Sequence, residues 1–223
     1  MKYLIQPDTM IKERRCVIAC EKPFCTSSYD NLPHILASNE QYVPIGSVEF
    51  VNEFARLKGI TIPENITYPQ EILHFLKRKV WQDKFSNVDD NLFVKPVKTK
   101  IFTGGIKKKL TEIVSSDEDV WVSDPLDIEA EFRYYVMDRK ILGSSRYDDK
   151  DNDCFPNEDV VRQIIEQYKN QPAGYAIDVG VVGGETILIE VNDGWALGYY
   201  PWGDFTRHQY VDLITARWKQ IEG

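Results

Sequence analysis

The sequence predicts a mixed α+β protein whose second half is built from antiparallel hairpins. Two apolar runs flank the loop Gly183-Gly184-Glu185, which is typical of a β-hairpin. A second pair of runs flanks Asp138-Arg139 in the same way. Apolar residues recur at helical spacing in three other segments: 48–58, 157–169 and 207–221.

The bulk properties are those of an ordinary globular protein. The chain has 223 residues, of which 43% are hydrophobic and 28% charged, so it can bury a real core as one large domain or two small ones. A formal net charge of -8 argues against a nucleic-acid or anionic-membrane partner. The sequence has no apolar run long enough to span a membrane and no signal peptide, so we expect a cytoplasmic protein.

The first 70 residues carry weaker patterns. Short apolar runs at 2–6 and 15–20 predict strands, and the polar composition of residues 21–37 predicts a loop. Ser47 is a good N-cap for a helix that stops near Gly59. Residues 60–67 are expected to be extended or loop.

A second helix is expected to begin at Pro69, since proline suits the first helical position, and its apolar residues run to Val80. We place the domain boundary in or near this helix, with domains at 1–75 and 76–223. Residues 83–91 are polar and are expected to form a connector.

Strands dominate from Leu92 onward. Besides the two strands that flank Gly183-Gly184-Glu185, strands are expected at 92–96, 98–103, 119–123, 131–136 and 140–147. Asn157 is the expected cap of a helix that runs to Lys169, and a last helix follows at 207–221.

The last hairpin places two carboxylates together. If its loop is Gly183-Gly184-Glu185, Asp178 lies opposite Glu190, and Asn192 shares the face of Glu190. Like charges in this position need a cation, a shared proton or a basic neighbour. Carboxylate and amide oxygens suit Mg²⁺. A loop one residue shorter or longer would put the two carboxylates on opposite faces.

Basic residues gather in the segment 95–109. Lys95 lies on an otherwise apolar strand and therefore needs an anionic partner. Thr103-Gly104-Gly105 can bring backbone N–H groups close to phosphate oxygens. Arg133 and Arg146 are two further candidate anion-binding residues, although Glu131 shares a face with Arg133 and is an alternative partner for it. Together with the acidic pair, which can bind a metal, these cations are the residues that phosphoryl transfer requires.

Other kinds of site find little support. Cys16, Cys20 and Cys25 have no histidine nearby and are expected to be free thiols rather than zinc ligands. The three histidines lie in different segments, and the sequence contains no P-loop, dinucleotide fingerprint or nucleophile elbow.

The order of these motifs resembles the ATP-grasp superfamily over about residues 70–223, in particular the clade named for one conserved arginine and two lysines. The matching segments are Phe93-Val94-Lys95-Pro96, Lys100-Ile101-Phe102-Thr103-Gly104, Glu131-Phe132-Arg133-Tyr134, Ile177-Asp178-Val179 and Ile189-Glu190-Val191-Asn192-Asp193-Gly194. The resemblance implies an ATP-grasp fold, in which two α+β subdomains hold a nucleotide, preceded by a small N-terminal α/β domain.

The resemblance also implies roles for individual residues. Lys95 and Lys100 would contact phosphates or the adenine edge, beside the shortened loop at Thr103 and Gly104. The strand containing Val120, Val122 and Ser123 would meet adenine through its backbone, and Asp127 would contact ribose. Mg²⁺ would be held by Asp178, Glu190 and Asn192, and Arg133 and Arg146 would bind the γ-phosphate or the carboxylate being activated.

The expected activity is an ATP- and Mg²⁺-dependent ligase that joins a small-molecule or peptide carboxylate to an amine through an acyl phosphate. Two alternatives stay open at this point: a small-molecule kinase, and a nucleotide-binding or interaction module without catalysis. The aromatic residues Trp195, Tyr199, Tyr200 and Trp202 follow the acidic motif and either line the site or pack in the core.

Overall fold

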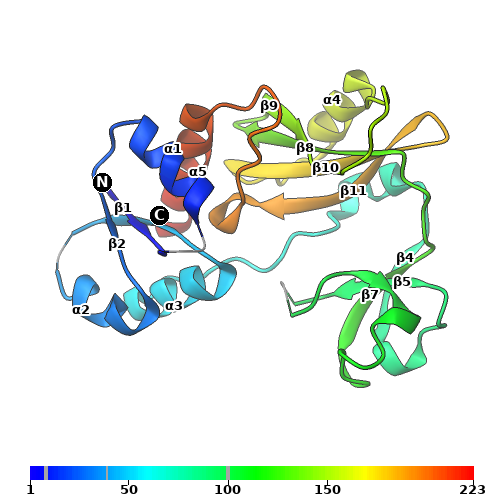
Figure 1. The fold of residues 1–223 in the computed structure, drawn as a ribbon, viewed down its shortest axis with the longest axis horizontal. Coiled ribbons are helices and arrows are strands. Elements are labelled where there is room, and N and C mark those ends of the chain that lie inside the picture. The colour runs from blue at the N-terminus through cyan, green and yellow to red at the C-terminus, as the bar shows by residue number, and fades with distance from the viewer. Residues whose placement is uncertain (8–9, 39, 99–100) are drawn as a thin grey trace.

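The computed structural model describes residues 1–7, 10–38, 40–98 and 101–223. Within these residues the chain forms one parallel sheet and two antiparallel sheets (Figure 1). The parallel sheet belongs to the N-terminal part. The antiparallel sheets lie one above the other in the view, at the right-hand side of Figure 1.

The N-terminal part is a three-stranded sheet in the order β2-β1-β3. Its elements are β1 (Lys2–Ile5), α1 (Ile11–Ala19), β2 (Phe24–Thr26), η1 (Tyr29–Asn31), α2 (Leu32–Leu36), β3 (Tyr42–Ile45) and α3 (Val48–Lys58). The strand predicted at 15–20 is wrong, because this segment is the second half of α1. Parallel strands need a crossover, and α1 supplies it between β1 and β2. The loop predicted at 21–37 is also wrong, since it contains β2 and α2.

The ends of α3 agree with the sequence prediction. The Ser47 hydroxyl accepts a hydrogen bond from the Phe50 N–H at 3.3 Å, and Gly59 ends the helix in the left-handed conformation at φ +69°. Val51 and Phe54 of α3 are fully buried in a core that also includes Trp218 near the C-terminus.

The central part forms a four-stranded sheet in the order β4-β7-β5-β6. Its elements are η2 (Gln70–Leu76), β4 (Val80–Lys84), η3 (Phe85–Asn87), β5 (Phe93–Pro96), β6 (Gly105–Ile106), η4 (Lys107–Lys109) and β7 (Asp119–Ser123). The predicted helix at 69–80 is thus a shorter 3₁₀ helix. Lys77 adopts φ +49° and stops it, and Val80 opens a strand in place of the expected helical end. The predicted connector at 83–91 includes the end of β4 and η3.

The C-terminal part forms the other four-stranded sheet, in the order β11-β10-β8-β9. Its elements are β8 (Ala130–Met137), β9 (Lys140–Arg146), α4 (Glu158–Gln167), β10 (Gly174–Val182), β11 (Glu185–Asp193), η5 (Gly194–Ala196) and α5 (Arg207–Glu222). Asn157 caps α4 as predicted, by accepting the Asp159 N–H. None of the described helices is both long enough and apolar enough to cross a membrane.

The two faces of this sheet have different partners. One face packs against α4, through residues such as Phe132, Ile177 and Val179. On the other face, Tyr135 and Ala176 join the core that α5 shares with the N-terminal sheet. The polar residues of the site lie on that second face.

The register of the β10–β11 hairpin is correct at the carboxylates, but the predicted loop is wrong. Val182 pairs with Glu185, so the loop is the two residues Gly183 and Gly184, at φ +57° and +79°. Both positive φ angles match the tight turn that suits antiparallel strands. A β-bulge then shifts the pairing by one residue between Val179 and Asp178, which brings Asp178 opposite Glu190 after all.

Candidate active site

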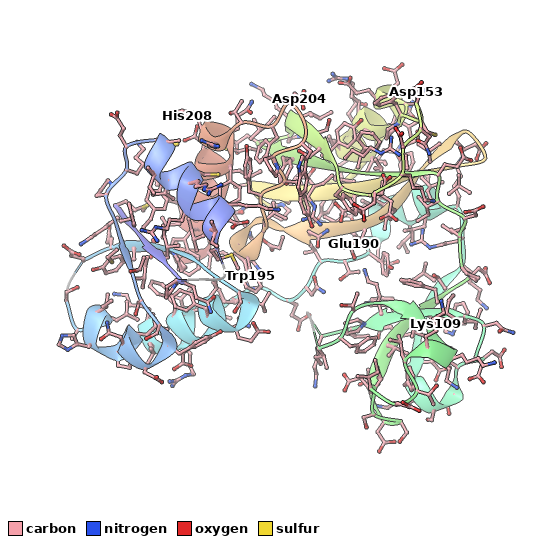
Figure 2. All side chains as sticks on the ribbon, in the orientation of Figure 1. Lys109, Asp153, Glu190, Trp195, Asp204 and His208 are labelled. Atoms are coloured by element: carbon pink, nitrogen blue, oxygen red, sulfur yellow. The ribbon has the colours of Figure 1, made fainter. Side chains whose placement is uncertain are left out.

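A cavity of about 620 Å³ lies between the two antiparallel sheets. We call it the interlobe cavity. Lys95 of β5, with Thr103 and Gly104, lines it from the central sheet, and Arg133, Glu190 and Asn192 line it from the C-terminal sheet. Figure 2 shows Glu190 on the side of the C-terminal sheet that faces the central sheet. Residues that the sequence separates widely therefore meet in one hollow.

An ion pair crosses the cavity. Lys95 Nζ donates a hydrogen bond to Glu190 Oε2, and it also lies 4.7 Å from the centre of the Tyr68 ring. Burial disfavours the charged form of Lys95, but Glu190 and Tyr68 outweigh it, so the pKa of Lys95 is raised. Burial likewise opposes the charge on Glu190, but Lys95 and Asn192 lower the pKa of this carboxyl overall. Both groups are therefore charged at neutral pH.

A second ion pair lies directly behind the first. Arg133 is opposite Asp178 on the neighbouring strand, and its Nε and Nη2 each donate to one carboxylate oxygen at 2.7 Å. Arg133 thus pairs with Asp178 and not with Glu131. Asn192 Nδ2 connects the two pairs, because it donates to Asp178 Oδ2 at 3.0 Å and to Glu190 Oε1 at 3.1 Å.

Burial has opposite effects within this pair. Burial raises the pKa of the Asp178 carboxyl, which is only 2% exposed, and opposes the charge on Arg133 by lowering its pKa. The nearby Arg133 guanidinium counteracts burial at Asp178 by lowering the pKa of that carboxyl. The pKa of Arg133 is itself raised, because Asp178 outweighs the effect of burial. The bidentate geometry and the hydrogen bond from Asn192 hold Asp178 as an anion with both of its oxygens engaged.

The donor set fits magnesium only in part. Glu190 and Asn192 line the cavity and offer the hard oxygens that Mg²⁺ prefers. Asp178 lies behind them and does not line the cavity, because Arg133 occupies its oxygens. Among the described residues, no group of three or more histidine, cysteine, aspartate or glutamate side chains is arranged to hold a metal. Cys16, Cys20, Cys25 and Cys154 form no disulfide within the described residues.

The predicted nucleotide contacts are only partly brought together. Thr103 and Gly104 line the cavity, and Gly104 lies so close to β5 that an added Cβ would stand 2.9 Å from the Phe93 ring. Lys100 lies outside the described residues. The remaining predicted contacts are absent from the lining of the interlobe cavity: Val120, Val122, Ser123 and Asp127.

The position of β7 explains this difference. It pairs with β4 on one edge and with β5 on the other, as far as Ser123. The backbone of Val120 and Val122 is therefore engaged in the sheet, so the adenine contact predicted from the sequence would require this pairing to break.

Sequence similarity links the chain to a known protein family. The profile of the family described as ATP-grasp domain, R2K clade family 2, matches residues 75–212, which is more than half of the chain. This protein belongs to the R2K clade of ATP-grasp domains. The resemblance to the ATP-grasp superfamily and the mixed α+β ATP-grasp fold predicted from the sequence are thereby confirmed. No curated protein sequence matches the chain.

Solved structures of the ATP-grasp fold cover nearly the whole chain. A RimK-domain ATP-grasp protein from Sphaerobacter thermophilus is 14% identical, with a TM-score of 0.56, and covers 96% of this chain and 100% of its own. D-alanine–D-alanine ligase from Bacillus anthracis is 12% identical, with a TM-score of 0.55, and covers 100% of both chains. N5-carboxyaminoimidazole synthetase from Staphylococcus aureus, bound to ADP, is 9% identical with a TM-score of 0.59, and covers 97% of this chain and 77% of its own. At these identities the likeness is one of fold.

In this R2K chain, Arg146 does not join Arg133. It lies opposite Phe132, on the face of the sheet that α4 covers, and binds Asp148 and Asn152. Its guanidinium is 5.7 Å from the Phe132 ring. The sequence places Arg133 and Arg146 on two strands, but only the register shows that they point to opposite faces.

The cavity also includes residues that the sequence reasoning missed. Arg78 donates to the Leu188 and Ile189 carbonyls at the β11 bulge, at 3.0 and 3.1 Å, and lines the cavity. Tyr68 and Tyr147 are aromatic walls beside Lys95 and Arg133. No local pattern marks these residues. Arg78 lies within the helix that the sequence predicts at 69–80, whereas the observed helix ends at Leu76 and leaves Arg78 beyond it.

Proposed function

We propose that this protein is an ATP- and Mg²⁺-dependent ligase that joins a carboxylate to an amine through an acyl phosphate. One observation carries the proposal: the Lys95–Glu190 ion pair spans the cavity between the two sheets, with Arg133 directly behind it. A cation and a hard oxygen ligand on facing lobes are suited to triphosphate and its metal. Membership of the ATP-grasp family supports the nucleotide as ATP.

Each residue then has a role set by its position. Lys95, with the backbone at Thr103 and Gly104, would neutralise phosphate charge from the central sheet. Arg133 uses Nε and Nη2 for Asp178, and its Nη1 has no hydrogen-bond partner among the described residues. This free end would contact the transferred phosphoryl group or the carboxylate that receives it. Arg146 has no place in the proposed mechanism.

We propose Glu190 and Asn192 as the cavity-facing magnesium ligands; Asp178 would become the third oxygen donor only once Arg133 released one of its oxygens. Bound magnesium would supply positive charge to the phosphates. Asp178 also fixes the guanidinium plane of Arg133, and Asn192 fixes both carboxylates. The chain therefore orients its cation and its oxygen ligands as one unit.

The proposed reaction has two steps. A carboxylate oxygen attacks the γ-phosphorus, the bond to the bridging oxygen of ADP breaks, and an acyl phosphate forms. The amine, in its neutral form after its ammonium has lost a proton, then attacks the acyl carbon through its nitrogen. The carbon–oxygen bond to phosphate breaks, and the proton that the nitrogen loses passes to the released phosphate. Arg133 would stabilise negative charge in the first step.

We further propose residues 1–75 as the domain that completes the acceptor side of the site and residues 76–223 as the catalytic domain. Val48 and Asn65 of the first segment already line the interlobe cavity. The acceptors would be small-molecule or peptide carboxylates and amines.

Product analysis tests the proposal. ADP and free phosphate released together with a new amide, from a mixture of carboxylates and amines, support ligation. ADP released with a phosphorylated product indicates a kinase and overturns it. The variant Arg133→Gln should lose turnover, whereas Arg146→Gln, on the opposite face of the same sheet, should retain it. Equal loss in both variants, with both folded, would refute the assignment of Arg133.

A further inference from the structure

A second cavity of about 370 Å³ adjoins the interlobe cavity on its N-terminal side. We call it the α1 cavity, because Lys12 and Glu13 of α1 line it together with the end of β3 and part of α5. Residues 195–198 and Tyr200 line both cavities. Trp195, labelled in Figure 2, belongs to this common wall. The two cavities are therefore separated by one short segment of chain.

The α1 cavity contains a buried carboxylate that lacks a counter-ion. Glu13 is only 7% exposed, and its Oε1 accepts one hydrogen bond, from the Tyr199 N–H at 2.9 Å. None of the described cations forms an ion pair with it. The ammonium of the neighbouring Lys12 lies instead 4.4 Å from the centre of the Trp202 ring. A buried carboxylate is costly unless a cation or several hydrogen bonds compensate it.

The rest of the lining is mostly apolar. Ile45, Leu197 and Ile214 are buried side chains that border the cavity, and Tyr210 adds an aromatic wall. The Tyr210 hydroxyl already donates to the Leu197 carbonyl at 2.9 Å, so it is not available to a ligand as a donor. The lining thus combines apolar surface with the Glu13 carboxylate, which has one hydrogen bond and no ion pair among the described residues, while the Lys12 ammonium is held against the Trp202 ring. A carboxylate beside apolar surface is complementary to a cation that carries an apolar group.

The common wall connects this charge to the proposed catalytic arginine. Tyr199 is held by Glu13 on one side, while the Tyr135 hydroxyl donates to the Gly198 carbonyl and accepts the Tyr200 N–H on the other. The Tyr200 ring lies 5.0 Å from the Arg133 guanidinium. A ligand held at Glu13 therefore lies one side-chain layer away from the position where the carboxylate would be activated.

We propose that the α1 cavity binds a primary amine with a short apolar side chain, as its ammonium form, with Glu13 as counter-ion. That the amine is the nucleophile of the ligation rests on the proposed function above. The binding of the amine does not depend on it, and the two ideas can therefore fail separately.

Two probes with the same carbon skeleton test the binding: isoamylamine and isoamyl alcohol, titrated into the full-length protein by calorimetry at pH 7. The wild type should bind the amine more tightly than the alcohol by roughly tenfold to a hundredfold, as expected for a hydrogen bond to a charged group. Glu13→Gln keeps the oxygen that accepts the Tyr199 N–H but removes the charge, so this preference should disappear. Glu53→Gln, on the exposed side of α3, is the matched control and should keep the preference.

Equal affinity for the two probes in the wild type would overturn the inference, as would an amine preference that survives in Glu13→Gln. Failure of both probes to bind would also overturn it. Thermal unfolding identifies a variant that has lost its fold, and Glu13→Asp then serves as a second variant that must retain some amine preference. Affinity for a non-hydrolysable ATP analogue reports separately on the interlobe cavity and should not change in Glu13→Gln. Absence of ligation with an intact amine preference would refute the proposed function alone.

Discussion

The Lys95–Glu190 ion pair allows stability and function to be separated by substitution. Lys95→Met keeps the length and packing of the side chain but removes its charge, leaving Glu190 without a cation. Glu190→Gln does the converse. The variant with both substitutions has neither charge and keeps a similar volume. If the pair serves only the fold, the double variant should behave like the wild type in every respect.

The expected loss of stability follows from the burial of the pair. The Lys95 side chain is 14% exposed and that of Glu190 is 27% exposed. Removing one partner of a fully buried pair costs about 3–5 kcal/mol, whereas an exposed pair is worth about 0–1 kcal/mol. We therefore expect Lys95→Met to lower the free energy of unfolding by about 2–3 kcal/mol. In the double variant no charge is left uncompensated, so its stability should return to within about 1 kcal/mol of the wild type.

Urea unfolding at pH 7 measures the stabilities, and calorimetry with a non-hydrolysable ATP analogue measures nucleotide binding. The double variant should be nearly as stable as the wild type, yet it should bind Mg-ATP at least about tenfold more weakly, as expected when a charge-assisted phosphate contact is lost. Lys77→Met is the matched control. Lys77 pairs with Glu185 on the same strand as Glu190, but both side chains are largely exposed, at 46% and 66%. This variant should leave the urea midpoint and nucleotide binding unchanged.

One result would refute this reasoning directly: a double variant that is stable and also binds and turns over ATP like the wild type. The pair would then be a structural link between the two sheets. A double variant as unstable as Lys95→Met alone would instead show that the burial argument is wrong.

Three further predictions concern the surrounding structure. Asp178→Asn should lower the free energy of unfolding by about 3 kcal/mol and abolish ATP turnover, because it leaves the buried Arg133 charge without its bidentate partner. Normal turnover in this variant would contradict the prediction. Asp148 is held charged, since hydrogen bonds from Arg146 and backbone N–H groups overcome burial and lower its pKa from 3.8 to about 2. The ionised Asp148 contributes about 2 kcal/mol to the free energy of unfolding above pH 4, and this contribution is lost as the pH falls towards 2. The difference in stability between wild type and Asp148→Asn, measured by urea unfolding, should therefore shrink over that range. A constant difference would contradict the assignment. Gly184→Ala should lower the stability measured by thermal unfolding by about 1 kcal/mol, because Gly184 has φ +79°, which strains a residue with a side chain even though a Cβ there has open space. An unchanged stability would show that the turn can change type.

The elements that the sequence predicted correctly are those with strong local patterns. Ser47 and Asn157 are caps whose side chains make the expected hydrogen bonds, and Asp138-Arg139 forms the turn of the β8–β9 hairpin. In each case the deciding interaction lies within a few residues along the chain. Local chemistry was sufficient there.

The errors have a common cause in tertiary context. Residues 15–20 are apolar enough for a strand, but the parallel pairing of β1 and β2 requires a helix between them. Val120 and Val122 have the expected strand conformation, yet their backbone is occupied because β7 is internal to its sheet. Arg133 finds Asp178 because β8 lies beside β10, and Arg146 turns to the other face because the β8–β9 register places it opposite Phe132. Strand order is a property of the whole fold and has no signature in any single segment.

The β11 bulge is the clearest example of how the fold builds the site. With a two-residue turn and uninterrupted pairing, Asp178 would face Ile189, and Glu190 would face Ile177 on the side that packs against α4. The bulge instead lets Leu188 and Val191 both lie in that apolar core while Glu190 turns to the cavity. The Ile189 side chain lies against Gly180: a Cβ added to Gly180 would stand 3.2 Å from the Ile189 side chain. Arg78 binds the two carbonyls at the bulge. The bulge adds one residue to β11 and so offsets a loop one residue shorter than predicted, which explains why counting residues along the hairpin reached the correct pair through the wrong loop.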